Sequence, residues 1–478
     1  MSTTSTSLAG QRIAALLDDN SFVEIGALVT ARATDFNMKQ QETPADGVIT
    51  GYGVIDGNLV YVYSQDASVM NGSVGEMHAK KIVGLYDLAM KTGAPVIGLI
   101  DSAGLRLQEA TDALNAFGSI YLKQSLASGV IPQITAVFGN CGGGLAMIPT
   151  LTDFTFMESK KAKLFVNTPN SLEGNEISKC DTSSADFQST KSGIVDFTGE
   201  EAEILTKIRE LVTILPANNE DNDAYAECTD DLNRATAELV NCVGDTAIAL
   251  ATISDNNMFY EVKSAYAKDM VTGFIRLNGM TVGAVANRTE VYNADGEVTD
   301  KFDTVLSVKG CYKAADFIQF CDAFEIPVLS LTNTKGFEAT KDSEKGIAHA
   351  VAKLTYAFAN ASVPKVNVII GKAFGSAYVA MNSKSIGADL TIAWSDAQIG
   401  MMDAKLASKI MYEGQGAEVI EEKAKEYAEL QNSVTSAARR GYVDQIIEAA
   451  DTRKYVIGAF EMLFTKKEDR PGKKHGTV

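Results

Sequence analysis

The chain has 478 residues, of which 46% are hydrophobic, and it carries 43 basic against 61 acidic side chains, for a net charge of −18. This size predicts a soluble protein with two ordinary cores, and no apolar run of ~18 residues indicates a transmembrane helix. The negative charge argues against nucleic acid as a partner, because phosphate binding requires a basic surface. The Ser/Thr-rich N-terminus lacks the apolar core of a secretory signal, so we expect a cytoplasmic protein.

Cysteine and histidine are used sparingly. The six cysteines contain no C-x-x-C pair, which argues against a zinc ribbon or a disulfide framework and favours reduced thiols. The chain has three histidines, His78, His349 and His475. They are too few for a His-rich metal site and provide hardly any candidate for the histidine of a Ser-His-Asp triad. We therefore expect no metal.

Taken in chain order, short apolar runs alternate with helical segments. The runs are nearly continuous, as expected for strands that are covered on both faces of a sheet. The helical segments between them are typical of crossover connections in a layered α/β fold. The predicted strands include residues 58–64, 95–100 and 133–138, and the predicted helices include residues 111–127 and 345–361.

The second half of the chain repeats the first. Landmark residues recur at one constant offset along the chain, namely Gly104 with Gly336, Pro132 with Pro364, Gly139 with Gly371, and Gly143 with Gly375. Two further glycines, Gly57 and Gly279, match upstream at a slightly shorter offset. Such a repeat predicts two homologous α/β domains in tandem. We place them at residues 1–225 and 226–478, with the polar, acidic segment 216–231 at their junction.

A glycine-rich turn follows the predicted strand 133–138. It comprises Gly139 to Gly144 and leads into a helical stretch that begins at Leu145. Glycines at such a turn let the backbone approach a ligand and aim N–H groups at it, and the helix dipole adds to the attraction for negative charge. The turn is typical of a phosphate site or of an oxyanion hole.

The repeat places a second such turn at residues 371–377. Two turns suit a reaction in which two carbonyl-type groups gain negative charge. A Rossmann phosphate loop is one alternative, but the spacing is not G-x-G-x-x-G, and no second strand ends in a ribose-binding acid. A packing turn is the other alternative.

Several single residues invite a catalytic interpretation. Ser376 could be a nucleophile, but its surroundings lack the outer glycines of G-x-S-x-G and no histidine partner is evident. Cys141 is more typical of a small core residue, and His349 of a packed or surface residue in an amphipathic helix. Arg106 and Glu109 are either a substrate-positioning pair, which we favour, or an ion pair at the start of a helix.

The segment from Asp101 to Glu109, DSAGLRLQE, resembles the D-S-G-G-A-R-x-Q-E element of the carboxyltransferase subunits of biotin-dependent acyl-CoA carboxylases and decarboxylases. The resemblance is to the propionyl-CoA carboxylase β and methylmalonyl-CoA decarboxylase α type and runs from about Arg12 onward. Further segments match the family motifs in the same order, at residues 128–133, 150–157, 308–310, 320–324, 363–365, 372–375 and 441–444. Together these matches are specific to the family, although each is weak evidence alone.

The resemblance implies two tandem crotonase-like (ClpP/crotonase) domains. It implies that the acyl-CoA binds to the N-terminal domain and biotin to the C-terminal domain of a partner subunit, within a homo-oligomer, usually a hexamer. Carboxybiotin would release CO₂, and the biotin nitrogen would take the α-proton, so that no side-chain base is required. No A-M-K-M motif is present, so biotin must arrive on a separate biotin carboxyl carrier protein. A biotin carboxylase or a membrane decarboxylase subunit would be a further partner.

Carried over residue by residue, the resemblance places an N-terminal oxyanion hole at Gly143 and Gly144, and a C-terminal one at Ser376 and Ala377. Substrate-binding residues implied by the same motifs are Ala103, Gly104, Arg106, Gly142, Gly336, Gly375 and Val379.

The sequence departs from the family pattern mainly on the biotin side. Ala103 replaces a glycine, and the segment from Asn333 to Thr340 lacks both prolines of the usual D-x-P-G-F-x-P-G loop. Ser376 also replaces a glycine, and Val379 stands where an Asp is often found, which predicts tolerance of an apolar α-substituent. The connection over residues 287–303 is longer and more acidic than usual.

The departures leave the acyl preference and the direction of the reaction open. The nearest alternative is the carboxyltransferase subunit of a sodium-pumping methylmalonyl- or glutaconyl-CoA decarboxylase. Others are a biotin-independent crotonase-type enzyme, although no acid directly follows Gly144, and a non-catalytic subunit.

Overall fold

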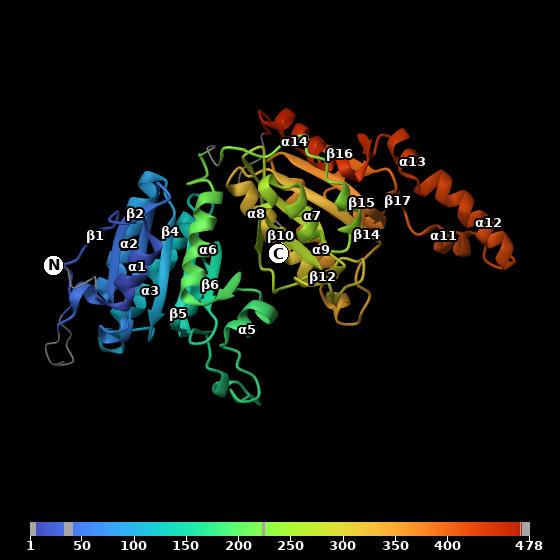
Figure 1. Cartoon of the computed structure of the whole chain (residues 1–478). Coiled ribbons are helices and arrows are strands. Elements are labelled where there is room, and N and C mark those ends of the chain that lie inside the picture. Colours follow the sequence, from blue (N-terminus) through green and yellow to red (C-terminus); the bar gives the residue numbers. More distant parts are fainter. Residues whose placement is uncertain (1–5, 33–41, 222–224, 469, 471–478) are drawn as a thin grey trace. The chain divides into compact units, whose positions relative to one another are not determined.

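The computed structural model describes residues 6–32, 42–221, 225–468 and 470 (Figure 1). It divides into two compact units, Met1–Ala224 and Tyr225–Val478, which is within one residue of the boundary expected from the repeat. His475 and part of the expected junction lie outside the described residues.

The first unit is built on an eight-stranded sheet of order β1-β2-β3-β4-β5-β6-β8, with β7 beside β5. The first three strands pair antiparallel, and the strands from β3 onward pair parallel. The strands are β1 Val23–Ile25, β2 Val48–Ile55, β3 Asn58–Gln65, β4 Val96–Ser102, β5 Gln133–Gly142, β6 Phe154–Glu158, β7 Lys163–Phe165 and β8 Phe197–Gly199. The helices are α1 Leu8–Leu16, α2 Glu76–Thr92, α3 Ala110–Ala127, α4 Met147–Thr150, α5 Ala185–Phe187 and α6 Glu201–Ile214.

Helices cover both faces of this sheet. Helix α2 packs with α3, and α1 packs with α6. Val137 of β5 belongs to the core beneath α2 and α3, whereas the next residue, Phe138, lies 4.7 Å from the Arg12 guanidinium of α1. Because successive side chains of a strand point to opposite faces, the two helix pairs form the outer layers of a sandwich. The apolar runs of the sequence are the buried middle layer.

The second unit repeats this topology. Its sheet has the order β9-β10-β11-β14-β15-β16-β18, with β17 beside β15. The strands are β9 Phe259–Val262, β10 Met270–Leu277, β11 Met280–Asn287, β12 Glu290–Tyr292, β13 Val298–Lys301, β14 Val328–Thr334, β15 Lys365–Phe374, β16 Leu390–Trp394, β17 Gln398–Gly400 and β18 Gln445–Ile447. The helices are α7 Thr246–Ile253, α8 Val308–Ala323, α9 Ile347–Asn360, α10 Gly375–Ala380, α11 Ala404–Met411, α12 Ala417–Tyr427, α13 Val434–Arg439 and α14 Thr452–Leu463.

The matching strand orders confirm the predicted fold class of two tandem α/β domains. The second unit adds two features. The long connection after β11 forms a separate hairpin, β12–β13. Helices α11 and α12 extend away from the sheet of this unit (Figure 1).

Local sequence explains the shared geometry. The β2–β3 hairpin turns through Asp56 and Gly57, at φ 47° and 83°, and the β10–β11 hairpin turns through Asn278 and Gly279, at φ 52° and 79°. Two left-handed residues in a row are typical of the tight turns that match the twist of antiparallel strands. Gly57 and Gly279, which the repeat pairs, therefore occupy equivalent positions in the two hairpin turns.

One expectation about the glycine turns is wrong. Gly139 and Gly371 do not begin the turns, because β5 continues to Gly142 and β15 continues to Phe374. A Cβ on Gly139 would overlap the Asp101 carboxylate, and a Cβ on Gly371 would overlap the Asn333 side chain. These glycines serve close packing beside the neighbouring strand, and the turns themselves begin at Gly143 and Gly375.

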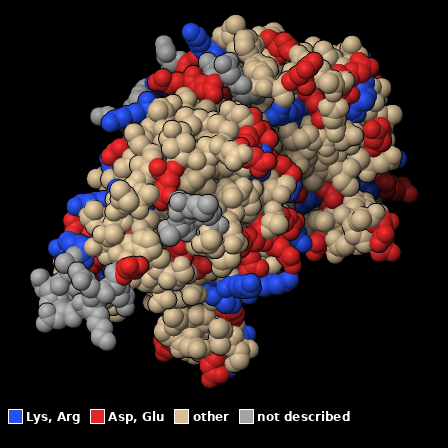
Figure 2. Space-filling view, turned by 60° about the vertical axis from the view of Figure 1, so that its left-hand side comes forward, with Lys and Arg blue, Asp and Glu red and all other residues tan. Residues whose placement is uncertain are grey.

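Two further features concern the length of the helices and the surface charge. Within the described ranges, no helix is both long and apolar enough to cross a membrane. On the face shown in Figure 2, Lys and Arg are scattered among Asp and Glu, and the described residues there form no continuous basic stripe. The exclusion of nucleic acid stays a prediction.

Candidate active site

The N-terminal turn follows the carboxyl end of β5. A short 3-10 turn, Gly143–Ala146, leads directly into α4. Gly143 has φ 63°, which favours glycine, and a Cβ there would meet nothing within 4 Å, so the turn faces open space. Gly142 precedes the turn and offers no side-chain cap. The first N–H groups of a helical turn have no acceptor within it, and here they belong to Gly143 and Gly144.

Gly144 is enclosed on one side by α3. The Tyr121 hydroxyl donates a hydrogen bond of 2.6 Å to the Gly144 carbonyl. A Cβ on Gly144 would lie 3.0 Å from that hydroxyl oxygen and 3.3 Å from the Phe117 ring. The two rings stack with their centroids 5.9 Å apart and an interplanar angle of 21°. At this position the missing side chain leaves room for the aromatic pair.

Cys141 lies just before the turn but is not presented to solvent. It is fully buried in the core, and burial raises the pKa of its thiol well above the usual value. A thiol that stays protonated is a poor nucleophile. The structure therefore confirms the interpretation of Cys141 as a core residue.

The loop after β4 lies against the same end of the sheet. Gly104 has φ 95°, and a Cβ there would lie 3.4 Å from the Gly142 carbonyl oxygen. Ala103 is exposed, and its N–H donates to the Asn71 carbonyl at 2.9 Å. Two of the predicted binding residues thus lie beside the glycine turn, at the carboxyl ends of parallel strands, where ligands of open α/β sheets commonly bind.

Arg106 is placed differently from our expectation. Its side chain is only 1% exposed and donates to Asp46 at 2.7 Å, to Glu109 at 2.8 Å and to the Ser73 carbonyl at 2.7 Å. Burial raises the pKa of Asp46, and the neighbouring Arg106 opposes that rise. These contacts match the ion-pair alternative rather than direct substrate positioning. The sequence suggested Glu109 as a partner but gave no sign of Asp46.

The C-terminal turn repeats the N-terminal geometry. Strand β15 ends at Phe374 and is followed directly by α10, in which Gly375 has φ 64°. The repeat pairs Gly375 with Gly143, and Ser376 with Gly144. The N–H groups of Gly375, Ser376 and Ala377 are the first three of the helix and have no acceptor within it. Ser376 is exposed, whereas Ala377 is buried.

The expected C-terminal pair, Ser376 and Ala377, is therefore shifted by one residue from the N-terminal pair. By backbone position the equivalent of Gly143 and Gly144 is Gly375 and Ser376. Val379, one turn further along α10, is 37% exposed.

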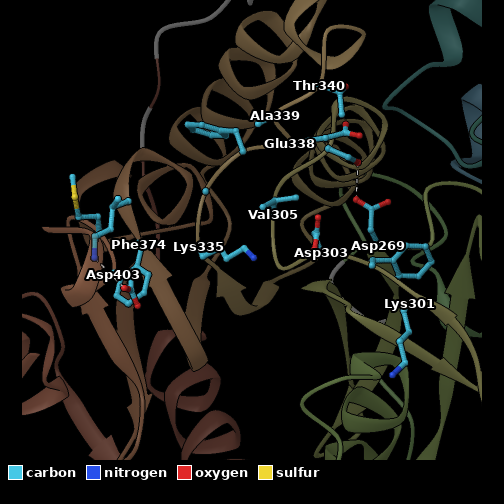
Figure 3. A pocket seen from close by; sticks show the side chains of 16 residues that line it. Asp269, Lys301, Asp303, Val305, Lys335, Glu338, Ala339, Thr340, Phe374 and Asp403 are labelled. Atoms are coloured by element: carbon cyan, nitrogen blue, oxygen red, sulfur yellow. Dashed lines mark hydrogen bonds between the residues drawn. The ribbon is translucent and has the colours of Figure 1, made fainter. Parts of the chain in front are cut away.

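A cavity of about 720 Å³ lies beside this second turn and is lined by Phe374, Gly336 and Met402. Its charged lining residues are Asp269, Lys301, Asp303, Lys335, Glu338 and Asp403. The Lys335 and Asp303 side chains both point toward the interior of the cavity (Figure 3). Of these residues the sequence motifs predicted only Gly336 as a binding residue. Lys335 and Glu338 lie on the same loop, whereas Asp269, Lys301, Asp303 and Asp403 come from separate segments.

The loop that lacks the family prolines is held by other contacts. The Asn333 side chain accepts a hydrogen bond from the Lys372 N–H at 3.0 Å, and the Asn333 N–H donates to Asn287 at 2.9 Å. Leu306 pairs with the loop on both sides, since its N–H donates to the Gly336 carbonyl and its carbonyl accepts from the Glu338 N–H, each at 2.9 Å. Backbone and side-chain hydrogen bonds thus hold this loop in place.

His349 lies exposed on α9, with its Nδ1 atom 3.3 Å from the Tyr312 hydroxyl. This confirms the interpretation of a surface histidine. Among the described residues, no group of three His, Cys, Asp or Glu side chains is arranged to hold a metal ion.

Two homologous α/β domains, each with a strand-to-helix turn that begins with backbone N–H groups free of helical acceptors, define an enzyme of the crotonase-like class. The family model described as the carboxyl transferase domain matches residues 4–478. The propionyl-CoA carboxylase beta chain of Roseobacter denitrificans is 40% identical over 484 residues, which cover 98% of this chain and 93% of that protein. The methylmalonyl-CoA decarboxylase subunit alpha of Veillonella parvula is 39% identical over 482 residues, with coverage of 98% and 92%.

A solved structure of a transcarboxylase 12S hexamer, with hydrolysed methylmalonyl-coenzyme A bound, is similar with a TM-score of 0.91 and 37% identity. The similarity covers 98% of this chain and 92% of that one. This chain belongs to the carboxyl transferase family and is an acyl-CoA carboxyltransferase.

Proposed function

We propose that the protein transfers a carboxyl group between biotin, held on a separate carrier protein, and the α-carbon of an acyl-CoA such as propionyl- or methylmalonyl-CoA. The observation that carries this proposal is the matched pair of turns at Gly143 and Gly375, which have φ 63° and 64° in two domains of the same topology. A carboxyl transfer between a thioester and a ureido group needs two oxyanion sites, one for each carbonyl.

The N-terminal turn serves the acyl-CoA. The N–H groups of Gly143 and Gly144 donate to the thioester oxygen as it gains charge during removal of the α-proton. Such a preorganised donor is worth ~10²–10³ in rate. Ala103, Gly104 and Gly142 form the adjoining wall, and the buried Arg106 braces the loop that carries Ala103.

The C-terminal turn serves biotin. The N–H groups of Gly375, Ser376 and Ala377 face the ureido oxygen, and the cavity of about 720 Å³ beside them has room for the bicyclic ring. Biotin supplies the ureido nitrogen that carries the carboxyl group. Lys301 and Lys335 add positive charge to a lining that also contains four carboxylates. Val379 leaves space for an apolar α-substituent on the acyl chain.

Because the acyl-CoA binds to one kind of domain and biotin to the other, each active site needs both kinds of domain, which favours an oligomer. We infer a cytoplasmic homo-oligomer, as in the transcarboxylase 12S hexamer. Exposed apolar side chains on α3 and α11 are suited to such interfaces; they are Leu114, Leu122, Leu126, Leu406, Ile410 and Met411. A biotin carboxyl carrier protein and a biotin carboxylase are the expected further partners.

A second candidate is the reverse reaction within a decarboxylase that has a membrane subunit. The observation in its favour is the similarity to the Veillonella parvula decarboxylase subunit, which at 39% is nearly the same as the 40% to the carboxylase chain. Both candidates use the same two turns.

The test is to incubate the purified protein with malonyl-, methylmalonyl- or glutaconyl-CoA and to measure decarboxylation with and without free biotin. We expect biotin-dependent loss of the carboxyl group, fastest with methylmalonyl-CoA. Turnover that is equal without biotin would overturn the proposal in favour of a biotin-independent enzyme. If none of the three acyl-CoA substrates is decarboxylated, the proposal is overturned in favour of a non-catalytic subunit.

A further inference from the structure

Tyr121 connects helix α3 to the N-terminal glycine turn. Its hydroxyl donates to the Gly144 carbonyl at 2.6 Å, and the N–H of Met147 is directed to the same carbonyl from within the turn. The Tyr121 ring is half-buried and stacks on Phe117. Burial raises the pKa of the hydroxyl, which therefore stays protonated and remains a donor near neutral pH.

The turn needs such support because it begins with two glycines, Gly143 and Gly144, and follows a third, Gly142. Glycine loses more conformational freedom on ordering than any other residue. A hydrogen bond to the Gly144 carbonyl restricts rotation about this residue and, through it, the orientation of the preceding peptide groups. Those peptide groups carry the N–H donors of Gly143 and Gly144.

The fold itself does not require this contact. At the offset that pairs Gly143 with Gly375, Tyr121 corresponds to Lys353, whose ammonium group instead pairs with Asp316 at 2.8 Å. Phe117 corresponds to His349. The second unit builds a turn of the same φ at Gly375 with these different side chains.

We propose that Tyr121 is a positioning residue of the acyl-CoA site, which acts through the Gly144 carbonyl to hold the N–H groups of Gly143 and Gly144 on the thioester oxygen. The proposal rests on the proposed function of the N-terminal turn. It assigns to the tyrosine a role in the transition state, where the donors matter most, rather than in binding the rest of the coenzyme.

The decisive variant is Tyr121→Phe, which keeps the ring stack and removes only the donor. Its matched control is Tyr61→Phe, which removes a hydroxyl that accepts a hydrogen bond from Thr92 at 3.2 Å, away from the turn. We expect kcat for Tyr121→Phe to fall about two- to tenfold, the range for the net free energy of one hydrogen bond. KM for the acyl-CoA should stay unchanged, and kcat of Tyr61→Phe should be normal.

The second readout is the carbonyl stretching frequency of bound propionyl-CoA labelled with ¹³C at the thioester, measured by difference infrared spectroscopy. Donation from the turn should lower this frequency in the unmodified protein, and Tyr121→Phe should move it back toward the value in free solution. A lowered frequency that is identical in Tyr121→Phe would overturn the positioning role, as would equal losses of kcat in both tyrosine variants. A frequency that is not lowered even in the unmodified protein would instead refute the proposed function of the N-terminal turn.

Discussion

The two glycine turns have the same backbone and different surroundings. Gly143 and Gly375 share φ values of 63° and 64° and follow equivalent strands, β5 and β15. The residue after Gly143 is a glycine packed against Tyr121 and Phe117, whereas the residue after Gly375 is the exposed Ser376, next to a cavity with charged walls. The repeat therefore preserves the position of the N–H donors, while the side chains around them differ between the two halves.

The largest effect should come from Gly143→Val. Valine is strained at φ 63° and would place its side chain in the open space beside the turn, where we propose that the thioester oxygen binds. We expect kcat to fall by ~10²–10³ or more. The matched control is Gly57→Val, since Gly57 also has positive φ, 83°, and nothing within 4 Å of a Cβ, but lies in the β2–β3 hairpin. Near-normal turnover of a Gly143→Val protein that is folded by circular dichroism would contradict the proposed role of this turn as an oxyanion hole.

A smaller effect should distinguish the two turns directly. Gly144→Ser introduces the residue that the second turn carries, but its Cβ would lie 3.0 Å from the Tyr121 hydroxyl oxygen. Such crowding typically costs about 1–3 kcal/mol, so we expect kcat to fall about tenfold. The reciprocal change, Ser376→Gly, meets no such crowding and should cost less. Equal kcat values in the two variants would show that the surroundings of the turns do not matter.

The pH dependence of stability should also differ between the units. His78, in the first unit, is fully buried, and burial lowers its pKa to about 3 from 6.5. Between pH 6.5 and about 3 the unfolded chain therefore binds a proton at His78 that the folded unit does not bind. The free energy of unfolding consequently decreases as the pH falls through this window, by at most ~1.4 kcal/mol per pH unit. The repeat places Gly310 at this position in the second unit.

Urea unfolding from pH 7 to pH 4, with the protein compared with a His78→Gln variant, measures this contribution. The variant should lose less stability over the range. If the free energy of unfolding depends on pH in the same way in both proteins, His78 does not contribute to the pH dependence of stability.

The smallest effect should come from His349→Ala. The residue is exposed, and its ring lies within hydrogen-bond distance of the half-buried Tyr312. Exposed substitutions usually change stability by less than ~0.5 kcal/mol, so kcat should stay within about twofold. Abolished turnover with an intact fold would identify a side-chain base and contradict backbone catalysis.

The sequence by itself determined the repeat, the two-domain α/β fold, the family and the presence of a glycine turn after β5 and after β15, but not where each turn begins. Constant spacing and apolar periodicity are local or self-similar signals, so they can be read without knowing any contact. The structure agrees closely where those signals act, as in α3, which covers Ala110–Ala127 against a predicted 111–127.

Only the tertiary structure decided what surrounds the turns. Arg106 bonds Asp46, 60 residues away, and the Tyr121 hydroxyl bonds Gly144, 23 residues away. Gly139 and Gly371 continue strands because a neighbouring side chain occupies the space that a Cβ would need. Such contacts depend on strand register and helix packing, which bring together residues that share no local pattern.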